Sequence, residues 1–329
     1  MKRILVIGLG SIGRRHLSIA KKCYPEVELL ALSSRGGNHK PELELRCDFA
    51  ASLTDALGYK PDMAIVASPA TLHLLHAEQL LSAGVPVLLE KPLATETQEA
   101  SAFVKRWCQS GKVALAYILR FSPLVNELRH MLAAGRLGRV LQVQINTGQF
   151  LPDWRPQTDY RRTVTAQKEL GGGVLLELSH ELDLIQWLLG KPESVCAFVA
   201  NSGSLDIDVE DQVDVLLKIQ RGAIVNLHID MLQRMPRREW ILTAEHGCLR
   251  VDLVAQQMQW CESVEQGWST QSFPHERDDL FVNQLQNFSQ YLTGENWRGA
   301  NLDDGVAVLN YIEHIRRASE QQCWVNVDE

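Results

Sequence analysis

Residues 3–13 read Arg-Ile-Leu-Val-Ile-Gly-Leu-Gly-Ser-Ile-Gly, near the start of a chain of 329 residues. The first half of this stretch is a short apolar run that contains β-branched residues and ends at glycine, which is typical of a buried strand. A helix with basic residues toward its end is expected over residues 12–22. The stretch therefore predicts a strand, a glycine turn and a helix, the first part of a parallel α/β domain.

The glycine turn has the spacing G-x-G-x-x-G, in which each glycine has its own role. Gly8 allows the tight turn, Gly10 lets the backbone approach a pyrophosphate, and Gly13 allows the helix to pack closely on the strand. Backbone N–H groups at the start of the helix, beside Ser11 and Ile12, offer hydrogen bonds to phosphate oxygens. We therefore expect these five residues to bind a dinucleotide.

The end of the second expected strand bears on which dinucleotide binds. A domain that prefers NAD usually has Asp or Glu about 20 residues beyond the glycine motif, where it holds the ribose 2′-hydroxyl. Residues 31–35 here read Ala-Leu-Ser-Ser-Arg, without an acid. A hydroxyl at Ser34 and a guanidinium at Arg35 suit a 2′-phosphate and favour NADP. In the alternative, both are ordinary loop residues of an NAD-dependent enzyme.

Strands alternate with helices up to about residue 120, which predicts right-handed crossovers and a doubly wound parallel sheet. We assign residues 1–120 to this α/β Rossmann domain. Further strands are expected over residues 27–33, 63–67, 86–90 and 113–117, and helices over 53–57, 71–83 and 96–110.

Beyond this point strands follow one another, with helices at the two ends of the segment. That order indicates an α+β domain with a largely antiparallel sheet, over residues 121–329. The expected elements are a helix over 124–134, strands over 140–147, 194–201, 211–220, 223–231 and 240–244, helices over 280–292 and 304–318, and a last strand over 323–327.

Composition excludes several classes of function. Acidic residues outnumber basic ones 40 to 33, and the formal net charge is -7, so no general affinity for nucleic acid is expected. No apolar stretch approaches the ~20 residues that a membrane helix needs, and we expect a cytoplasmic protein without a membrane partner. The seven cysteines are far apart and form no C-x-x-C pair, so neither a metal site nor a disulfide framework is expected.

Three further segments complete a recognisable pattern. They are Ser68-Pro69-Ala70-Thr71-Leu72-His73, Glu90-Lys91-Pro92, and Gly171-Gly172-Gly173 followed by Glu177-Leu178-Ser179-His180-Glu181-Leu182-Asp183. With the glycine turn, they resemble the glucose–fructose oxidoreductase / inositol dehydrogenase / rhizopine-catabolism (Gfo/Idh/MocA) family over nearly the whole chain. The resemblance implies a second domain whose open sheet serves oligomerisation, as a homodimer or homotetramer, and an active site between the domains. It also assigns Ser68, Pro69, His73 and Glu90 to the cofactor site.

The same resemblance implies catalytic roles. Lys91 corresponds to the residue beside the nicotinamide and the substrate hydroxyl, His180 to the general acid/base, and Glu177 to an acid that supports it. The family commonly shows Asp-x-x-x-His, whereas Glu177 and His180 are three residues apart. That spacing still predicts one helix face for both, although Glu181 competes for the position four residues away. Asp183 is as well suited to orient His180 as to act on substrate.

The residue types agree with this chemistry. Oxidation of a carbinol requires removal of the hydroxyl proton, and an imidazole such as His180 titrates near neutral pH. Lys91 can donate a hydrogen bond to the developing alkoxide and join a proton relay with His180. The alternative for His180 is a core or helix-capping histidine.

A segment with two prolines, two aromatic rings and three arginines over residues 151–162 is the candidate substrate loop. The rings of Trp154 and Tyr160 suit the apolar face of a sugar, and Arg155 or Arg161 suits a carboxylate or phosphate. The alternative is a surface loop with solvated arginines. Weaker pocket candidates, Tyr117 and Arg120, follow the last strand expected in the first domain.

These features predict an NAD(P)-dependent oxidoreductase that acts on a CH–OH group of a sugar, a sugar acid or a cyclitol. One alternative is an enzyme that uses the cofactor transiently, with elimination or hydrolysis proceeding through a ketone. The other is a dinucleotide-binding sensor without turnover, which conflicts with the presence of both Lys91 and His180.

Overall fold

The computed structural model describes residues 1–34 and 46–327, so Arg35 lies outside the described residues. The chain divides into two units. The first consists of Met1–Phe121 and Glu276–Leu309, and the second of Ser122–His275 and Asn310–Glu329. The sequence placed residues 276–309 in the second domain, whereas in the structure they belong to the first unit.

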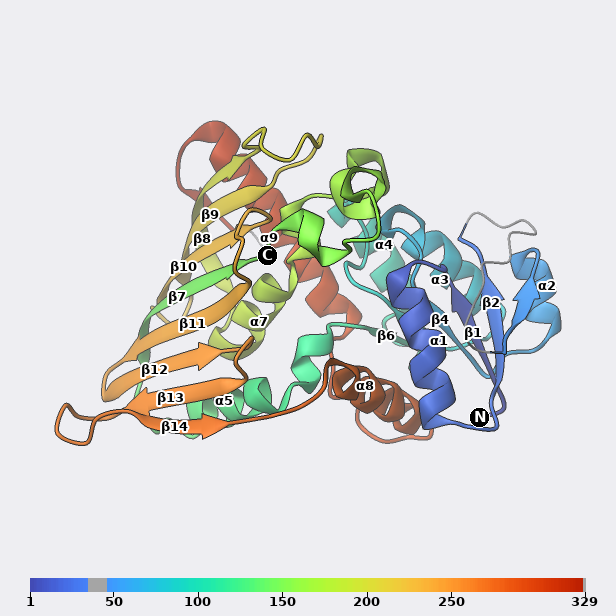
Figure 1. Cartoon of the computed structure of the whole chain (residues 1–329), viewed down its shortest axis with the longest axis horizontal. Coiled ribbons are helices and arrows are strands. Elements are labelled where there is room, and N and C mark those ends of the chain that lie inside the picture. The colour runs from blue at the N-terminus through green and yellow to red at the C-terminus, as the bar shows by residue number, and fades with distance from the viewer. Residues whose placement is uncertain (35–45, 328–329) are drawn as a thin grey trace. The chain divides into compact units, whose positions relative to one another are not determined.

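The first unit contains a six-stranded parallel sheet in the order β3-β2-β1-β4-β5-β6, as the alternating pattern predicted (Figure 1). The order reverses beside β1, and ligands of such sheets bind at the carboxyl ends of the strands at this reversal. The strands are β1 (Arg3–Ile7), β2 (Glu28–Leu32), β3 (Asp48–Ala50), β4 (Met63–Val66), β5 (Val87–Leu89) and β6 (Val113–Leu115), and the helices between them are α1 (Ser11–Cys23), α2 (Leu53–Gly58), α3 (His73–Ser82) and α4 (Thr97–Trp107).

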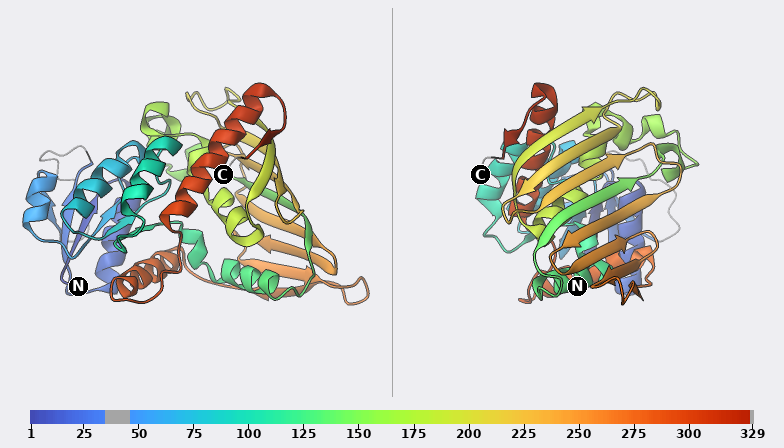
Figure 2. Two further views of the ribbon diagram at one scale, coloured as in Figure 1. Left: turned by 180° about the vertical axis from the view of Figure 1, so that it is seen from behind. Right: turned by 90° about the vertical axis from the view of Figure 1, so that its left-hand side faces the viewer.

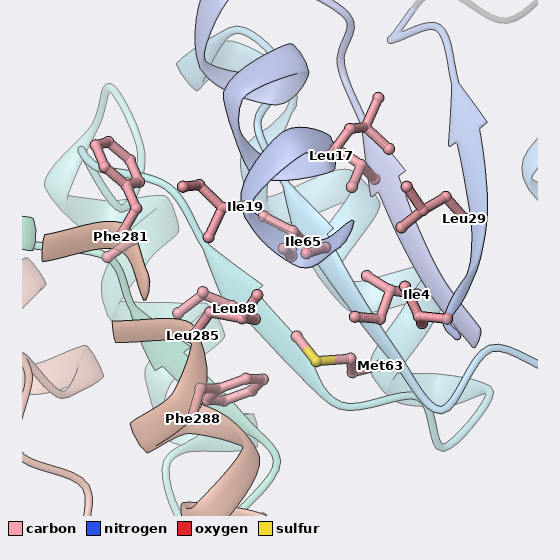
Figure 3. Close-up of a cluster of buried hydrophobic side chains, with 14 of the residues drawn as sticks. Ile4, Leu17, Ile19, Leu29, Met63, Ile65, Leu88, Phe281, Leu285 and Phe288 are labelled. Carbon is pink, nitrogen blue, oxygen red and sulfur yellow. The ribbon is translucent and has the colours of Figure 1, made fainter. Parts of the chain in front are cut away.

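Helix α8 (Arg277–Tyr291) explains why the chain returns to the first unit. Its buried side chains Phe281, Leu285 and Phe288 join the core formed by the central strands and α1 (Figure 3). Burial of three large apolar side chains contributes about 1.5–3 kcal/mol each, so this packing fixes the segment to the first unit. The periodicity predicted the helix but not the sheet against which it packs.

The second unit is built on a nine-stranded sheet in the order β14-β13-β12-β11-β7-β10-β9-β8-β15. Strands β7 and β10 pair in parallel and the other neighbours are antiparallel, which confirms the largely antiparallel sheet. The strands are β7 (Val140–Gly148), β8 (Pro192–Ala200), β9 (Gln212–Ile219), β10 (Ile224–Asp230), β11 (Arg237–Ala244), β12 (Gly247–Asp252), β13 (Gln257–Cys261), β14 (Ser269–Ser272) and β15 (Val325–Asn326).

Four strands were not expected from the sequence. Strand β3 has three residues, and β14 is exposed throughout and contains no apolar residue, so neither has the alternation that marks a half-buried strand. Strands β12 and β13 have only six and five residues, which gives a short alternation, and they pair with each other and with β11 and β14.

One face of the large sheet carries α5 (Pro123–Ala133), α7 (His180–Leu189) and the second half of α9 (Leu302–Gln321), while no element of this unit covers the other face over the described ranges (Figure 2). Strand β9 shows the same division, with Val213, Val215, Leu217 and Ile219 buried and the intervening side chains exposed. Within the described ranges, no helix has the length and apolar character that crossing a membrane demands.

Candidate active site

The glycine turn has the geometry that a dinucleotide pyrophosphate requires. Gly8 has φ +97°, and a Cβ atom there would lie 2.3 Å from the carbonyl oxygen of Ala67. A Cβ atom on Gly13 would lie 1.8 Å from the carbonyl oxygen of Gly8, whereas a Cβ atom on Gly10 would meet nothing within 4 Å. The first and third glycines are therefore required by the turn and by helix packing, and the second leaves open space for a ligand.

The start of α1 is suited to an anion. The helix begins at Ser11 and has no acidic residue in its first turn, and its N-cap residue, Gly10, has no side chain to cap the N-terminal N–H groups. Arg14, which the sequence analysis did not single out, donates from Nε to the carbonyl oxygen of Leu9 at 3.0 Å and so braces the turn. Ile12 packs against the core of the unit. These residues fit the phosphates of a dinucleotide.

Ser34, the described member of the expected 2′-phosphate pair, lies two residues beyond the end of β2. The backbone N–H of Gly8 donates to the carbonyl oxygen of Leu32 at 2.8 Å, which ties the glycine turn to the end of this strand. The strand that leads to Ser34 therefore ends beside the phosphate turn, as in dinucleotide-binding sheets.

Two turns follow the carboxyl ends of β4 and β5, and buried His73 lies between them. Its Nδ1 lies 2.7 Å from the carbonyl oxygen of Pro92, and its Nε2 lies 2.8 Å from that of Ser68. Burial is the largest influence on this ring and lowers the pKa of His73. Because both ring nitrogens contact backbone carbonyls, His73 joins the Ser68–Pro69 turn to the turn that carries Lys91.

Glu90 is the buried acid of the Glu-Lys-Pro turn, and both its oxygens have partners. One carboxylate oxygen lies 2.7 Å from Nε2 of His16 on α1, and the other accepts the backbone N–H of Lys91 at 3.2 Å. The structure therefore brings together Glu90, Lys91, Ser68 and His73 beside the end of β5. Strands β1, β4 and β5 are parallel, so the glycine turn after β1 lies at the same edge of the sheet. Pro92 follows through a cis peptide bond.

The two weaker pocket candidates are interior residues of the first unit. Tyr117 is only 1% exposed. Arg120 is 4% exposed, and its Nη1 lies 3.1 Å from Oδ2 of Asp304 and 3.4 Å from the carbonyl oxygen of Gly299. The guanidinium thus anchors the segment that leads into α9, and the structure supports a structural role for Arg120.

In the second unit, the expectation that Glu177 and His180 share one helix is wrong. Glu177 ends α6 (Val174–Glu177) and His180 begins α7. Between them, Leu178 leaves the helical region with ψ 23°, and its carbonyl oxygen accepts the N–H of Glu181 three residues later. The continuous four-residue hydrogen-bond pattern is interrupted here, and Glu177 instead accepts a hydrogen bond from the Thr165 hydroxyl at 2.7 Å.

The structure also separates the three acids that were candidates to assist His180. Glu181 is fully buried and binds Arg238 through both oxygens, at 2.8 and 2.9 Å, while the hydroxyl of Thr147 donates to it at 2.7 Å. Its carboxylate is therefore directed to the sheet. Asp183 is buried on α7, three residues after His180 and so on the same side of that helix. Glu177 and Asp183 remain as candidates.

The loop over residues 151–162 forms two 3-10 turns, Leu151–Trp154 and Tyr160–Arg162. The indole N–H of Trp154 donates to the carbonyl oxygen of Gln149 at 3.0 Å, and the Tyr160 hydroxyl donates to that of Leu205 at 2.9 Å. Exposed Arg161 pairs with Asp159 at 3.0 Å, whereas Arg155 is half-buried. Among the described side chains, no group of His, Cys, Asp and Glu could hold a metal ion.

Family models match both parts of the chain. Residues 2–117 match the model described as an oxidoreductase family with an NAD-binding Rossmann fold, and residues 125–250 match the GFO/IDH/MocA C-terminal domain. The two matches lie in the order that the sequence motifs predicted.

Known relatives agree with these matches. The Bacillus subtilis protein YteT is 28% identical over 59% of this chain, a match that covers 42% of YteT. Inositol 2-dehydrogenase 2 of Saccharopolyspora erythraea is 26% identical over 92% of this chain and 88% of its own length. The structure of levoglucosan dehydrogenase in complex with NADH and levoglucosan has a TM-score of 0.84, with 17% identity and 99% of both chains covered, and shows the same fold. The chain therefore belongs to the Gfo/Idh/MocA family of oxidoreductases, with an NAD(P)-binding Rossmann domain followed by that family's C-terminal domain.

Proposed function

We propose that the protein transfers a hydride between NADP, in preference to NAD, and a CH–OH carbon of a sugar, sugar acid or cyclitol. One observation carries the proposal: the glycine turn and the Lys91 turn lie at the same carboxyl edge of the parallel sheet, after β1 and β5. This is the edge at which such sheets bind their ligands. The open space at Gly10 and the start of α1, which has no acidic residue in its first turn, fit the dinucleotide phosphates.

Lys91 has the role of an electrophilic donor in this proposal. The bound dinucleotide supplies the hydride acceptor or donor. The ammonium group of Lys91 donates a hydrogen bond to the substrate oxygen, on which negative charge develops during hydride transfer. The backbone of this turn is fixed by Glu90 and, through Pro92, by His73, so Lys91 is presented from a rigid support.

His180 has the role of general base for oxidation and general acid for reduction. It is the first residue of α7, immediately after the break that follows α6. Asp183 on α7 or Glu177 at the end of α6 orients the ring. Glu181 does not have this role, because Arg238 and Thr147 bind its carboxylate.

The cofactor preference rests on Ser34 and Arg35, which follow a strand that ends without an acid. We expect a fluorescence titration to show that NADPH binds at least about tenfold more tightly than NADH, because the hydroxyl and guanidinium together bind the 2′-phosphate. In the matched variant Ser34→Asp the preference is expected to move toward NADH, since a carboxylate accepts the ribose 2′-hydroxyl and repels a 2′-phosphate. Equal binding of the two cofactors by the parent protein would contradict the assignment to NADP.

The substrate class follows from the family and from the loop over residues 151–162. Trp154 offers a flat apolar face for a pyranose or cyclitol ring. Half-buried Arg155 offers a fork for the carboxylate of a sugar acid. The names of two relatives, an inositol dehydrogenase and a levoglucosan dehydrogenase, support a compact polyhydroxylated ring.

We also propose a homodimer or homotetramer formed through the uncovered face of the large sheet. On this face Phe198 of β8 is 63% exposed, and Leu216 of neighbouring β9 is 37% exposed. Beside them, His228 lies between Asp214 and Asp230, at 2.8 and 2.9 Å, and these carboxylates raise the pKa of His228 to about 9. Exposed apolar side chains beside a fixed polar network are typical of a surface that pairs with a second copy.

A further inference from the structure

We propose that His16 is a positioning residue for Lys91: it holds Glu90, which holds the backbone of Lys91, and so ties the helix after the glycine turn to the catalytic turn. The inference rests on the proposed catalytic role of Lys91. It concerns a residue that the sequence analysis left unassigned.

His16 is fixed in the interior of the first unit. It is 1% exposed, and its ring meets the ring of Phe281 on α8 edge to face, with 5.4 Å between centroids. The guanidinium of Arg15 also lies over the Phe281 ring, with its Cζ atom 5.4 Å from the ring centroid. A ring packed in this way has little freedom to rotate, so its polar atoms keep their direction.

The direction of the hydrogen bond between His16 and Glu90 follows when Glu90 is a carboxylate. An ionised carboxylate accepts hydrogen bonds and does not donate them, so Nε2 of His16 is the donor over the distance of 2.7 Å. The other ring nitrogen, Nδ1, is buried and has no hydrogen-bond partner among the described residues. Glu90 is therefore the single polar anchor of this ring, and the ring is a fixed anchor for Glu90.

Glu90 in turn fixes the backbone of Lys91. Its second oxygen accepts the Lys91 backbone N–H at 3.2 Å. Without the His16 donor, the buried carboxylate would lose a charge-assisted hydrogen bond and would turn toward another donor or toward water. The start of the Lys91 side chain would then move with the turn, and displacement of a catalytic group by about 1 Å can cost about 100-fold in rate.

The position of His16 in α1 gives this contact a further consequence. The same helix offers its N-terminal N–H groups to the dinucleotide phosphates, and His16 lies in its second turn. The helix that meets the cofactor therefore also sets the position of Lys91. His16 itself is directed to Glu90, so it acts on the reaction without contributing to the affinity for the dinucleotide.

Two replacements of His16 separate positioning from packing. Methionine fills a similar volume without a donor, whereas the amide of glutamine places an N–H group near the position of Nε2. We expect His16→Met to lower kcat by about 10–100-fold with KM and the NADPH dissociation constant within about threefold of the parent, and His16→Gln to retain kcat within about threefold. Steady-state kinetics and NADPH fluorescence titration measure these quantities.

If His16→Met does not fold, a second variant tests the same chain of contacts from His16 through Glu90 to Lys91. In Glu90→Met the side chain has no oxygen to accept from either His16 or the Lys91 N–H, and kcat is expected to fall. His314, a buried histidine in α9 whose Nδ1 lies 2.7 Å from the Asn310 carbonyl oxygen, provides the matched control. His314→Met is expected to leave kcat unchanged.

Parent-like kcat in both His16→Met and Glu90→Met would overturn the inference, and so would equal losses in His16→Met and His16→Gln. If Lys91→Met is inactive while these variants turn over normally, only the positioning role is wrong. If Lys91→Met itself retains kcat, the proposed function fails first.

Discussion

Replacement of Lys91 by methionine is expected to lower kcat by about 10³-fold or more while NADPH binding stays within about threefold of the parent. Methionine keeps the length of the side chain and removes the donor to the substrate oxygen. The backbone of the turn keeps its partners, because Glu90 accepts the N–H of residue 91 and His73 contacts the carbonyl of Pro92. The loss should therefore fall on kcat and leave the fold and the dinucleotide affinity intact.

Two further variants sharpen this result. Lys91→Arg is expected to restore little activity, since a planar guanidinium cannot take the place of a compact ammonium. Lys112→Met, at an exposed lysine just before β6, is the matched control and should turn over as the parent does. A kcat for Lys91→Met within about tenfold of the parent would remove Lys91 from the chemistry.

The second large effect concerns the buried ion pair of the second unit. Arg238→Met is expected to lower the free energy of unfolding by about 3–5 kcal/mol, because it leaves the Glu181 carboxylate buried without its counter-charge. Glu181 has no exposed side-chain surface, and Arg238 binds both of its oxygens from β11. Urea unfolding followed by tryptophan fluorescence measures the change.

The control for this prediction is an exposed pair of the same chemistry. Arg139 pairs with Glu245 at 3.2 Å, with both side chains more than a third exposed, and Arg139→Met should cost at most about 1 kcal/mol. The double variant Glu181→Leu with Arg238→Met should recover much of the stability, because it buries no unpaired charge. A loss below about 1 kcal/mol for Arg238→Met alone would show that the pair does not hold this face of the sheet.

Much of the fold could be predicted because its signals are local. The glycine turn after β1 and the alternation of apolar runs with helices specify the parallel sheet without any long-range information. The place of α8 could not be predicted, because an apolar helix face does not reveal which core it joins, and Phe281 and Phe288 complete the core of the first unit. Strand β14 has no apolar residue at all, and only its pairing with β13 reveals it.

The arrangement of the candidate site could be predicted only for residues that a motif places next to one another in the chain. Glu90 and Lys91 are adjacent in the chain and lie on one turn. The spacing of Glu177 and His180 predicted a shared helix face, but spacing cannot show the break at Leu178. His16 was missed although a signal was present, since it occupies a buried position of α1, between Gly13 and Ala20, where a polar ring needs a partner.

The central claim is net hydride transfer, and the most direct measurement follows the near-ultraviolet absorbance of reduced nicotinamide together with substrate loss. The protein would be supplied with NADP or NAD and a panel of aldoses, sugar acids and cyclitols, and with the reduced cofactors and the matching ketones. The account predicts reduced cofactor formed, or consumed, in equal amount to the substrate converted. Substrate converted with no net change in nicotinamide absorbance would contradict it and would show that the cofactor is used only transiently.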